Sequence, residues 1–221
     1  MKKINTATIE ENDNTSGAPI AQDPTILNPT TRGEHIAYWV SQLGSPPMMV
    51  LIALTLTSLA LSLPRAWVWA GIYICLAVGF PIGYLVWMVR KGKLTDLDVH
   101  LREQRGGPMI ATLLGLGIAW LVLHFGGAPS YLKLLAGTSL IQTILLAMIT
   151  LRWKISFHTS TAAGMTVMVL SVLGKPAAPL VITVPLIAWS RVKLRHHTPA
   201  QTIAGTALGS AVFLTAILLL G

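Results

Sequence analysis

The chain has 221 residues, of which 53% are hydrophobic and only 11% are charged, and its formal net charge is +8. Soluble domains carry about 25% charged residues, so this composition excludes an ordinary soluble globule, and the apolar content excludes a mainly disordered chain. The basic residues interrupt apolar stretches, which favours a membrane protein with basic loops over a nucleic-acid-binding protein. The single cysteine, Cys75, excludes a disulfide framework and a cysteine zinc cluster.

The N-terminal region, residues 1–45, differs in composition from the rest of the chain. It is polar and rich in Asn, Thr and Pro, and it lacks sustained helical periodicity. We expect it to be mostly disordered, with a short interfacial helix near His35–Leu43. Residues 46–221 then form a second, membrane-embedded domain.

Seven apolar runs follow, separated by short breaks. About 20 residues are needed to cross the hydrocarbon of a bilayer as a helix, and helices satisfy their own backbone polar groups there. We therefore predict an all-α, polytopic transmembrane helical bundle of about six to seven spans, in which Gly205 and Gly209 provide a small-residue packing face. The predicted runs are 47–63, 66–89, 108–127, 131–151, 159–173, 176–190 and 200–220.

The distribution of basic residues sets the expected orientation. If every run spans, all but three of the 16 Lys and Arg residues lie on the side of the N-terminus; the exceptions are Arg65, Lys133 and Lys175. Because cytoplasmic loops carry the excess of Lys and Arg, we expect the N-terminus and the three basic loops to be cytoplasmic.

The first basic loop, residues 93–108, contains both acidic and basic residues. Asp98, Arg102 and Arg105 would lie on one face of a helix, and Lys93 precedes them. All eight acidic residues of the chain come before residue 104. Any carboxylate used in catalysis must therefore come from this loop or from the N-terminal region.

The second and third loops each place a histidine at a predicted helix N-terminus, where backbone N–H groups attract anions. His158 follows Ser156 at the start of one helix. His197 precedes Thr198, Pro199 and Gln201, which have the chemistry of an N-cap, a first helical residue and a capping box. Such a histidine beside guanidinium groups is suited to attack on phosphorus.

These loops together resemble the type 2 phosphatidic acid phosphatase superfamily, which includes vanadium haloperoxidases. Ser190-Arg191, five further residues and His197 match the family motif Ser-Arg-x5-His-x3-Asp. Ser156-Phe157-His158 is similar to the motif Pro-Ser-Gly-His, and the first motif, Lys-x6-Arg-Pro, is represented only by Arg105. The resemblance covers roughly residues 93–209, and its third motif is the specific one.

The resemblance implies a phosphatase that needs no metal or other cofactor. His197 would be the nucleophile that forms a phosphohistidine, and His158 the general acid. Arg191, Arg105 and Ser156, with Arg102 and Lys93, would bind the phosphate of a membrane lipid phosphate or an isoprenoid diphosphate. Gln201 and Asp98 would orient the site.

Two departures from the family pattern leave alternatives open. Gln201 stands where the family has an aspartate, and Asp98 stands where it has a phosphate-binding lysine. A degenerate scaffold or lipid-binding subunit without turnover is therefore one alternative. A magnesium-dependent prenyltransferase that uses Asp96 and Asp98 is the other.

We expect an integral protein of a bacterial or archaeal cell membrane. Its partners are then the bilayer and a lipid phosphate or isoprenoid diphosphate, without nucleic acid. An oligomer or a larger membrane complex is compatible with the sequence.

Overall fold

The computed structural model describes residues 29, 31–93 and 106–220, and within these ranges the chain folds into helices without a β-strand. The all-α prediction is thus confirmed for the described part of the chain. Each of the seven predicted apolar runs falls on helical structure. In chain order the elements are α1 (Arg32–Leu43), α2 (Pro46–Leu61), α3 (Pro64–Ile74), the π-helical η2 (Cys75–Gly79), α4 (Phe80–Arg90), α5 (Gly106–Phe125), α6 (Ser130–Thr150), α7 (Phe157–Leu173), the 3-10 helix η4 (Lys175–Ile182), α8 (Thr183–Lys193) and α9 (Pro199–Leu220).

Pro81 explains why α3 and α4 are joined by a π-helical segment. Pro81 has no backbone N–H, and in an α-helix its ring would clash with the carbonyl of Ala77, four residues earlier. Just before it, the Phe80 N–H donates to the carbonyl of Cys75, five residues back. This wider turn makes room for the proline ring while the helix continues to Arg90.

The run 176–190, predicted as one short helix, is divided in the structure. Its first part is the 3-10 helix η4 and its second part is α8. Pro176 and Pro179 both lie in η4, where each removes a backbone donor, so a regular α-helix begins only at Thr183. The predicted hairpin between α7 and this run is retained.

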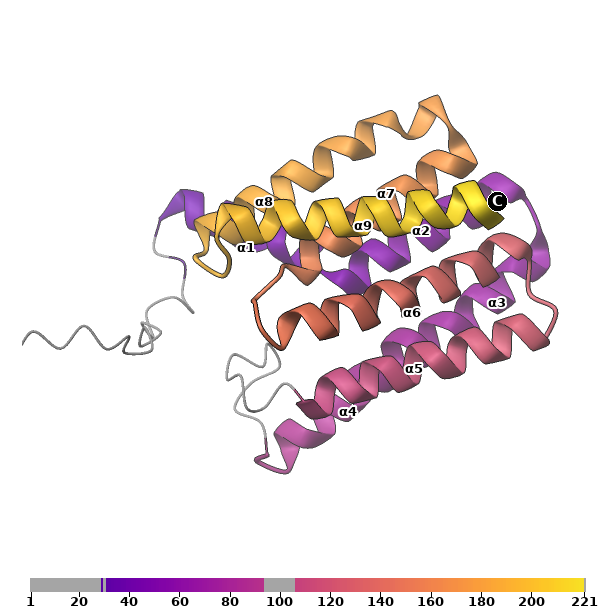
Figure 1. The fold of residues 1–221 in the computed structure, drawn as a ribbon, viewed down its shortest axis with the longest axis horizontal. Coiled ribbons are helices and arrows are strands. Elements are labelled where there is room, and N and C mark those ends of the chain that lie inside the picture. The colour runs from indigo at the N-terminus through magenta and orange to yellow at the C-terminus, as the bar shows by residue number, and fades with distance from the viewer. Residues whose placement is uncertain (1–28, 30, 94–105, 221) are drawn as a thin grey trace, which may run out of the picture.

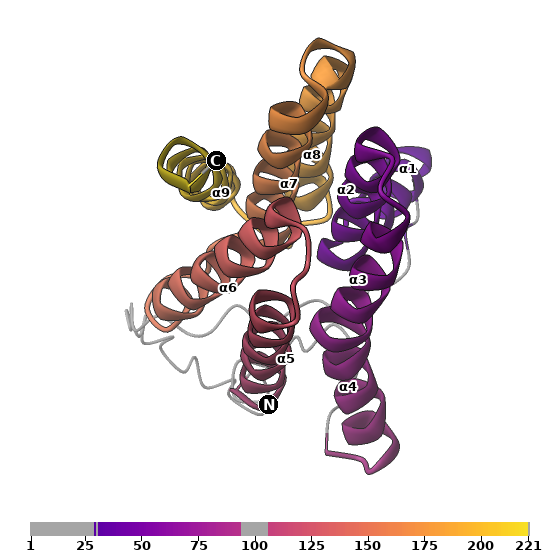
Figure 2. The same cartoon turned by 90° about the vertical axis from the view of Figure 1, so that its right-hand side faces the viewer.

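The second and third basic loops lie at one end of the bundle, together with the described helix ends that flank residues 94–105 (Figure 1). Figure 1 shows that α4, α6 and α8 end there, and that α5, α7 and α9 begin there. In Figure 2, α7 and α8 lie between the α1–α2 pair on one side and α6 and α9 on the other. Helix α7 packs against both α2 and α9 and is therefore central to the fold.

Helices α7 and α9 approach each other closely where the predicted small-residue face lies. A Cβ atom on Gly205 would come within 2.5 Å of the Ser156 carbonyl oxygen, and one on Gly209 would overlap the carbonyl oxygen of Ser160. The Thr159 hydroxyl also donates to the Thr202 carbonyl at 3.0 Å. The start of α7 is therefore held against the start of α9.

Part of the N-terminal region belongs to the bundle. Helix α1 begins with a capping box between Thr31 and Glu34, and it includes the predicted helix near His35–Leu43. Its Ala37 and Ser41 are buried, and it packs against α8. The predicted domain boundary at residue 45 therefore separates a helix from the elements on which it packs. Residues 1–28 lie outside the described part.

Four helical segments in the described part are long and apolar enough to cross a membrane: Pro64–Arg90, Gly106–Phe125, Ser130–Thr150 and Pro199–Leu219. The pair α1 and α2, bent by 55°, would make a fifth span if it crosses as one unit. Helix α7 is apolar but has only 17 residues. These helices are compatible with an integral membrane protein.

Candidate functional site

A cavity of about 440 Å³ lies at the end of the bundle where the second and third basic loops are found. At that end its basic and imidazole lining comes from two segments that are distant in sequence: the loop before α7 with the start of that helix, and the end of α8 with the loop before α9. The cavity continues between α2, α3–α4, α5, α6 and α7, where most lining side chains are apolar and a few, such as Tyr73, Ser139 and Gln142, are polar. The basic and imidazole side chains of the lining are Lys154, His158, Arg191, His196 and His197.

His197 is held by the N-terminal cap of α9. Its Nδ1 lies 3.0 Å from Oε1 of Gln201. The same Oε1 accepts a hydrogen bond from the backbone N–H of Thr198 at 3.1 Å, and the Gln201 N–H donates to the Thr198 hydroxyl at 3.4 Å. The predicted capping box of Thr198, Pro199 and Gln201 is therefore confirmed, and it also positions the histidine.

This arrangement determines the tautomer of His197. The backbone N–H of Thr198 can only donate, so the atom that it reaches must be the amide oxygen of Gln201 and not the amide nitrogen. That oxygen accepts hydrogen bonds, so Nδ1 of His197 must carry the hydrogen. In the neutral ring Nε2 then holds the lone pair, as a nucleophilic histidine requires.

The surroundings of His197 keep it neutral at physiological pH. Burial lowers its pKa from 6.5 to about 4, and the charges of Arg191 and Lys154 act in the same direction. Hydrogen bonds to Gln201 and to the backbone of Lys154 favour the charged ring, which carries a hydrogen on both nitrogens, and they are outweighed. A neutral imidazole is the form that can attack an electrophile.

Arg191, in the last turn of α8, is positioned by the N-terminal helix. Its Nη1 donates to the hydroxyl of Ser41 at 2.7 Å, and Ser41 is buried in α1. The Arg191 carbonyl also accepts from the backbone N–H groups of His196 and His197, at 3.0 and 3.2 Å. Arg191 therefore connects α1, α8 and the loop that bears the histidines.

His158 is the second residue of α7, and it lines the same cavity as His197 and Arg191. Ser156 is placed differently from the phosphate-binding role expected of it. Its side chain is fully buried and is the N-cap of α7, where it accepts from the Thr159 N–H at 3.4 Å. Its backbone N–H donates to the Gln201 carbonyl at 3.3 Å, so Ser156 joins the second and third loops.

The residues of the first loop are mostly beyond the described ranges. Asp96, Asp98, Arg102, Glu103 and Arg105 all lie in the undescribed residues 94–105. The role of Asp98 and the alternative of a magnesium-dependent prenyltransferase both depend on them.

Lys93 belongs to the described residues and lies against α4. Its ammonium nitrogen is 5.7 Å from the centroid of the Trp87 ring. This is a cation–π distance. Lys93 is not among the described residues that line the cavity.

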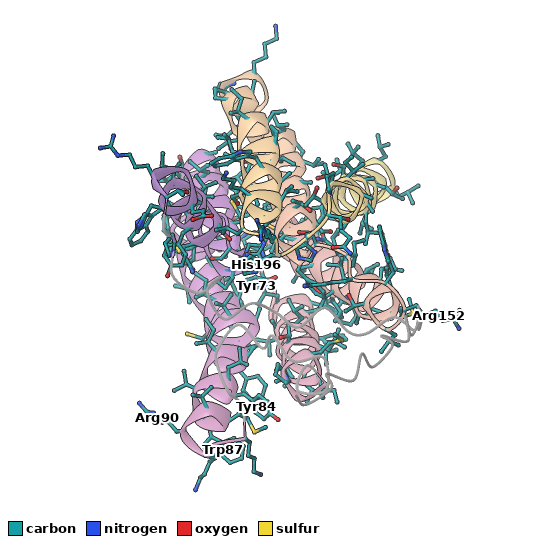
Figure 3. The ribbon with its side chains drawn as sticks, turned by 90° about the vertical axis from the view of Figure 1, so that its left-hand side faces the viewer. Tyr73, Tyr84, Trp87, Arg90, Arg152 and His196 are labelled. Atoms are coloured by element: carbon teal, nitrogen blue, oxygen red, sulfur yellow. The ribbon has the colours of Figure 1, made fainter. Side chains whose placement is uncertain are left out.

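The structure adds residues that the motifs did not indicate. Lys154 and His196 line the polar end of the cavity, and Tyr73 lines it from α3. Figure 3 shows His196 and Tyr73 near the middle of the molecule, whereas Trp87, Arg90 and Arg152 lie at its edge. Both Lys154 and His196 stand within the basic loops, so their charge was a usable sequence signal. Nothing in the sequence pattern indicated Ser41 as a partner of Arg191.

The described residues contain no group of three His, Cys, Asp or Glu side chains arranged to hold a metal ion. Comparisons with protein families, with curated proteins and with solved structures find no significant match to this chain. The chemistry of the cavity therefore has to be argued from its own residues.

Proposed function

We propose that this protein is a membrane-embedded phosphatase of the type 2 phosphatidic acid phosphatase kind, acting on a lipid phosphate or isoprenoid diphosphate through a phosphohistidine on His197. The observation that supports this most is the convergence of His197, His158 and Arg191 on one cavity. Their loops are separated by more than 30 residues of hairpin, yet the third motif's arginine and histidine face the same space as the second motif's histidine.

The proposed reaction has two steps. In the first, Nε2 of His197 attacks the phosphorus, the bond to the leaving oxygen breaks, and His158 gives that oxygen a proton. Burial, followed by the charges of Arg191, His197 and His196, holds the pKa of His158 well below 6.5, so the ring takes up this proton beside the negative charge of the bound phosphate. Arg191 and Lys154 stabilise the negative charge of the transferring phosphoryl group. In the second, His158, now neutral, takes a proton from a water molecule that attacks the phosphohistidine, and inorganic phosphate leaves.

Gln201 gives this chemistry a specific character. It orients His197 as an aspartate would, but it is neutral and cannot balance the positive charge that the ring gains on phosphorylation. We infer slower turnover than a member with a carboxylate at this position. A scaffold that binds lipid phosphates without turnover is the second candidate. The neutral side chain of Gln201 beside His197 favours it.

The membrane placement is part of the proposal. We infer six to seven spans, with the basic end of the bundle on the cytoplasmic side, because the excess of Lys and Arg lies there. The apolar lining of the cavity supports a substrate whose chain lies among the helices, including Val50, Leu116 and Met165. The phosphate would then lie at the level of the two histidines.

Phosphate release tests the proposal. Detergent-purified protein is given phosphatidate or a long-chain isoprenoid diphosphate in EDTA, with and without vanadate. We expect release that vanadate inhibits, that His197→Ala abolishes and that the exposed-site control His35→Ala retains. Absence of release by folded wild-type protein would favour the scaffold, and equal release by His197→Ala would refute the nucleophile.

A further inference from the structure

Helix α1 carries its large apolar side chains on the side that faces away from the bundle. Its inward side consists of small residues, and the buried members of the helix are Ala37 and Ser41. Ile36, Trp39 and Leu43 stand three and four residues apart, so they share one side of the helix. Their exposed fractions are 59%, 64% and 60%, respectively. Most of the apolar surface of α1 is therefore left uncovered by the described part of the chain.

Contacts with α8 place α1 at one level of the bundle. A Cβ atom on Gly33 would lie 3.7 Å from Cε of Lys193, and one on Gly44 would overlap the side chain of Ile187. Helix α1 thus runs along the last turns of α8 in the opposite direction, and Figure 1 shows both at the end of the molecule where α9 begins. Over those turns α8 changes from the apolar Ile187 through Trp189 to the basic Lys193. A tryptophan between apolar and basic residues is typical of the membrane–water interface.

The length, direction and charge of α1 agree with that level. Its 12 residues extend about 18 Å, which is less than the roughly 30 Å of hydrocarbon in a bilayer. It is bent by 55° from α2, so it departs from the direction in which α2 would cross. The side chains of Arg32 and Lys193 are exposed at the N-terminal end of α1, where they can reach the phosphates of lipid headgroups.

We propose that α1 is a membrane-surface helix. Its side formed by Ile36, Trp39 and Leu43 binds the interfacial region of the bilayer, and this contact holds its inward side on α8. The bilayer is the partner that matches an apolar side with a tryptophan, adjacent cations and a position at the interface.

The contact has a consequence for the candidate site. Ser41, on the inward side of α1, accepts a hydrogen bond from Nη1 of Arg191 at 2.7 Å. A helix of 12 residues is only marginally stable alone, and the small side chains on the inward side bury little apolar surface. Bilayer contact therefore helps to keep Ser41 against Arg191.

The depth of two neighbouring residues tests the membrane contact. Spin labels are attached to Leu43→Cys or to the matched control Gln42→Cys, in the full chain carrying Cys75→Ser and reconstituted in vesicles of phosphatidylcholine and phosphatidylglycerol. Gln42 is exposed like Leu43 but lies outside the apolar side. Power saturation gives the accessibility of each label to oxygen, which concentrates in the bilayer, and to a water-soluble nickel chelate. We expect the oxygen-to-nickel accessibility ratio to be severalfold higher at residue 43 than at residue 42.

Three results would overturn the membrane contact. Access of the nickel chelate to both labels would place α1 in water, and a high oxygen ratio at both would make α1 part of a span. A label on residue 43 that neither reagent reaches would show that another segment of this chain, or a second copy, covers the apolar side.

A distance between α1 and α8 tests whether the bilayer holds the two helices together. Spin labels on His35→Cys and Leu186→Cys, both at exposed positions, are measured by double electron–electron resonance in the same vesicles. We expect one narrow distance distribution, which the double change Trp39→Ser and Leu43→Ser broadens because α1 then leaves α8. Ile203→Ser changes an exposed apolar residue of α9 in the same way, and this control should leave the distribution narrow.

A second pair of labels shows whether the bundle stays folded. Arg65→Cys and Lys175→Cys lie at exposed positions at its opposite end. A broadened distance between α1 and α8 with this second distance unchanged supports the proposal, and two unchanged distances overturn it. Where both distances are lost, Trp39→Ser alone is the smaller change that decides by the same two distances. Neither measurement needs phosphate release, so failure of the membrane contact and failure of the proposed phosphatase are seen separately.

Discussion

Replacing Gln201 by glutamate should convert a neutral support of His197 into a charged one. Gln201 uses a single oxygen for both the Thr198 N–H, at 3.1 Å, and Nδ1 of His197, at 3.0 Å. Glutamate has the same length, so Gln201→Glu keeps that oxygen in place. The substitution replaces only the amide nitrogen with a second oxygen. The side chain becomes a carboxylate, so a negative charge lies within hydrogen-bonding distance of the His197 ring.

The size of the effect follows from the difference between neutral and charged hydrogen bonds. A neutral hydrogen bond contributes about 0.5–1.5 kcal/mol and one to a charged group about 1.5–3 kcal/mol. Gln201→Glu should therefore favour the positively charged ring of His197 by roughly 1.4 kcal/mol. Since a tenfold change corresponds to about 1.4 kcal/mol, the pKa of His197 should rise from about 4 to about 5. The same stabilisation of a charged phosphohistidine predicts a roughly tenfold higher kcat.

Gln201→Leu is the matched opposite change. It removes the acceptor of both hydrogen bonds, so α9 should lose about 0.5–2 kcal/mol of capping stability. The ring should lose its fixed tautomer, and kcat should fall by about tenfold.

Two assays read these changes. Nitrogen NMR of the labelled imidazoles during a pH titration gives the pKa of His197, and phosphate release gives kcat. An unchanged pKa in Gln201→Glu, or wild-type kcat in Gln201→Leu, would show that Gln201 does not orient the histidine.

Three further predictions concern packing, substrate affinity and pH. Gly209→Ala forces α9 away from α7 and should lower the free energy of unfolding by about 1–3 kcal/mol. In the control Gly117→Ala the added methyl meets open space, so the change should be neutral or stabilising. Similar Tm values for the two variants would contradict the packing described. Ser41→Ala removes the partner of Arg191 Nη1, so KM for a lipid phosphate should rise by about tenfold while kcat stays within about twofold, and an unchanged KM would refute the positioning role of α1. Because the pKa of His197 is about 4 in the folded protein against 6.5 ordinarily, its contribution to stability is complete above pH 6.5 and is lost as the pH falls toward 4. Thermal unfolding should show a smaller loss over that range for His197→Ala, and equal losses would count against the buried neutral ring.

The sequence predicted the helices and the local design of the third loop well, because both depend on short-range patterns. Apolar runs of helical length located the described helices from α2 onward, and Thr198, Pro199 and Gln201 located the start of α9. The small-residue spacing of Gly205 and Gly209 likewise predicted a close helix contact, since only a missing side chain allows it.

What the sequence left unpredicted depends on which helices pair. Ser41 and Arg191 are separated by 150 residues, and no periodicity relates α1 to α8. Ser156 was expected at the phosphate, but a serine before a helix satisfies the backbone first, and it caps α7. Gln142 lies with Ser139 and Thr143 in an otherwise apolar run, and only the fold shows that it lines the cavity and donates to Ser160.

The central claim is that His197 accepts the phosphoryl group, and trapping of that adduct tests it most directly. Folded protein in EDTA is mixed with phosphatidate carrying radioactive phosphorus, quenched in alkali during turnover and digested for peptide mapping. We predict label on the peptide that contains His197, lost in His197→Ala together with phosphate release. Phosphate release without a labelled peptide, or a label that persists in His197→Ala, would contradict the mechanism.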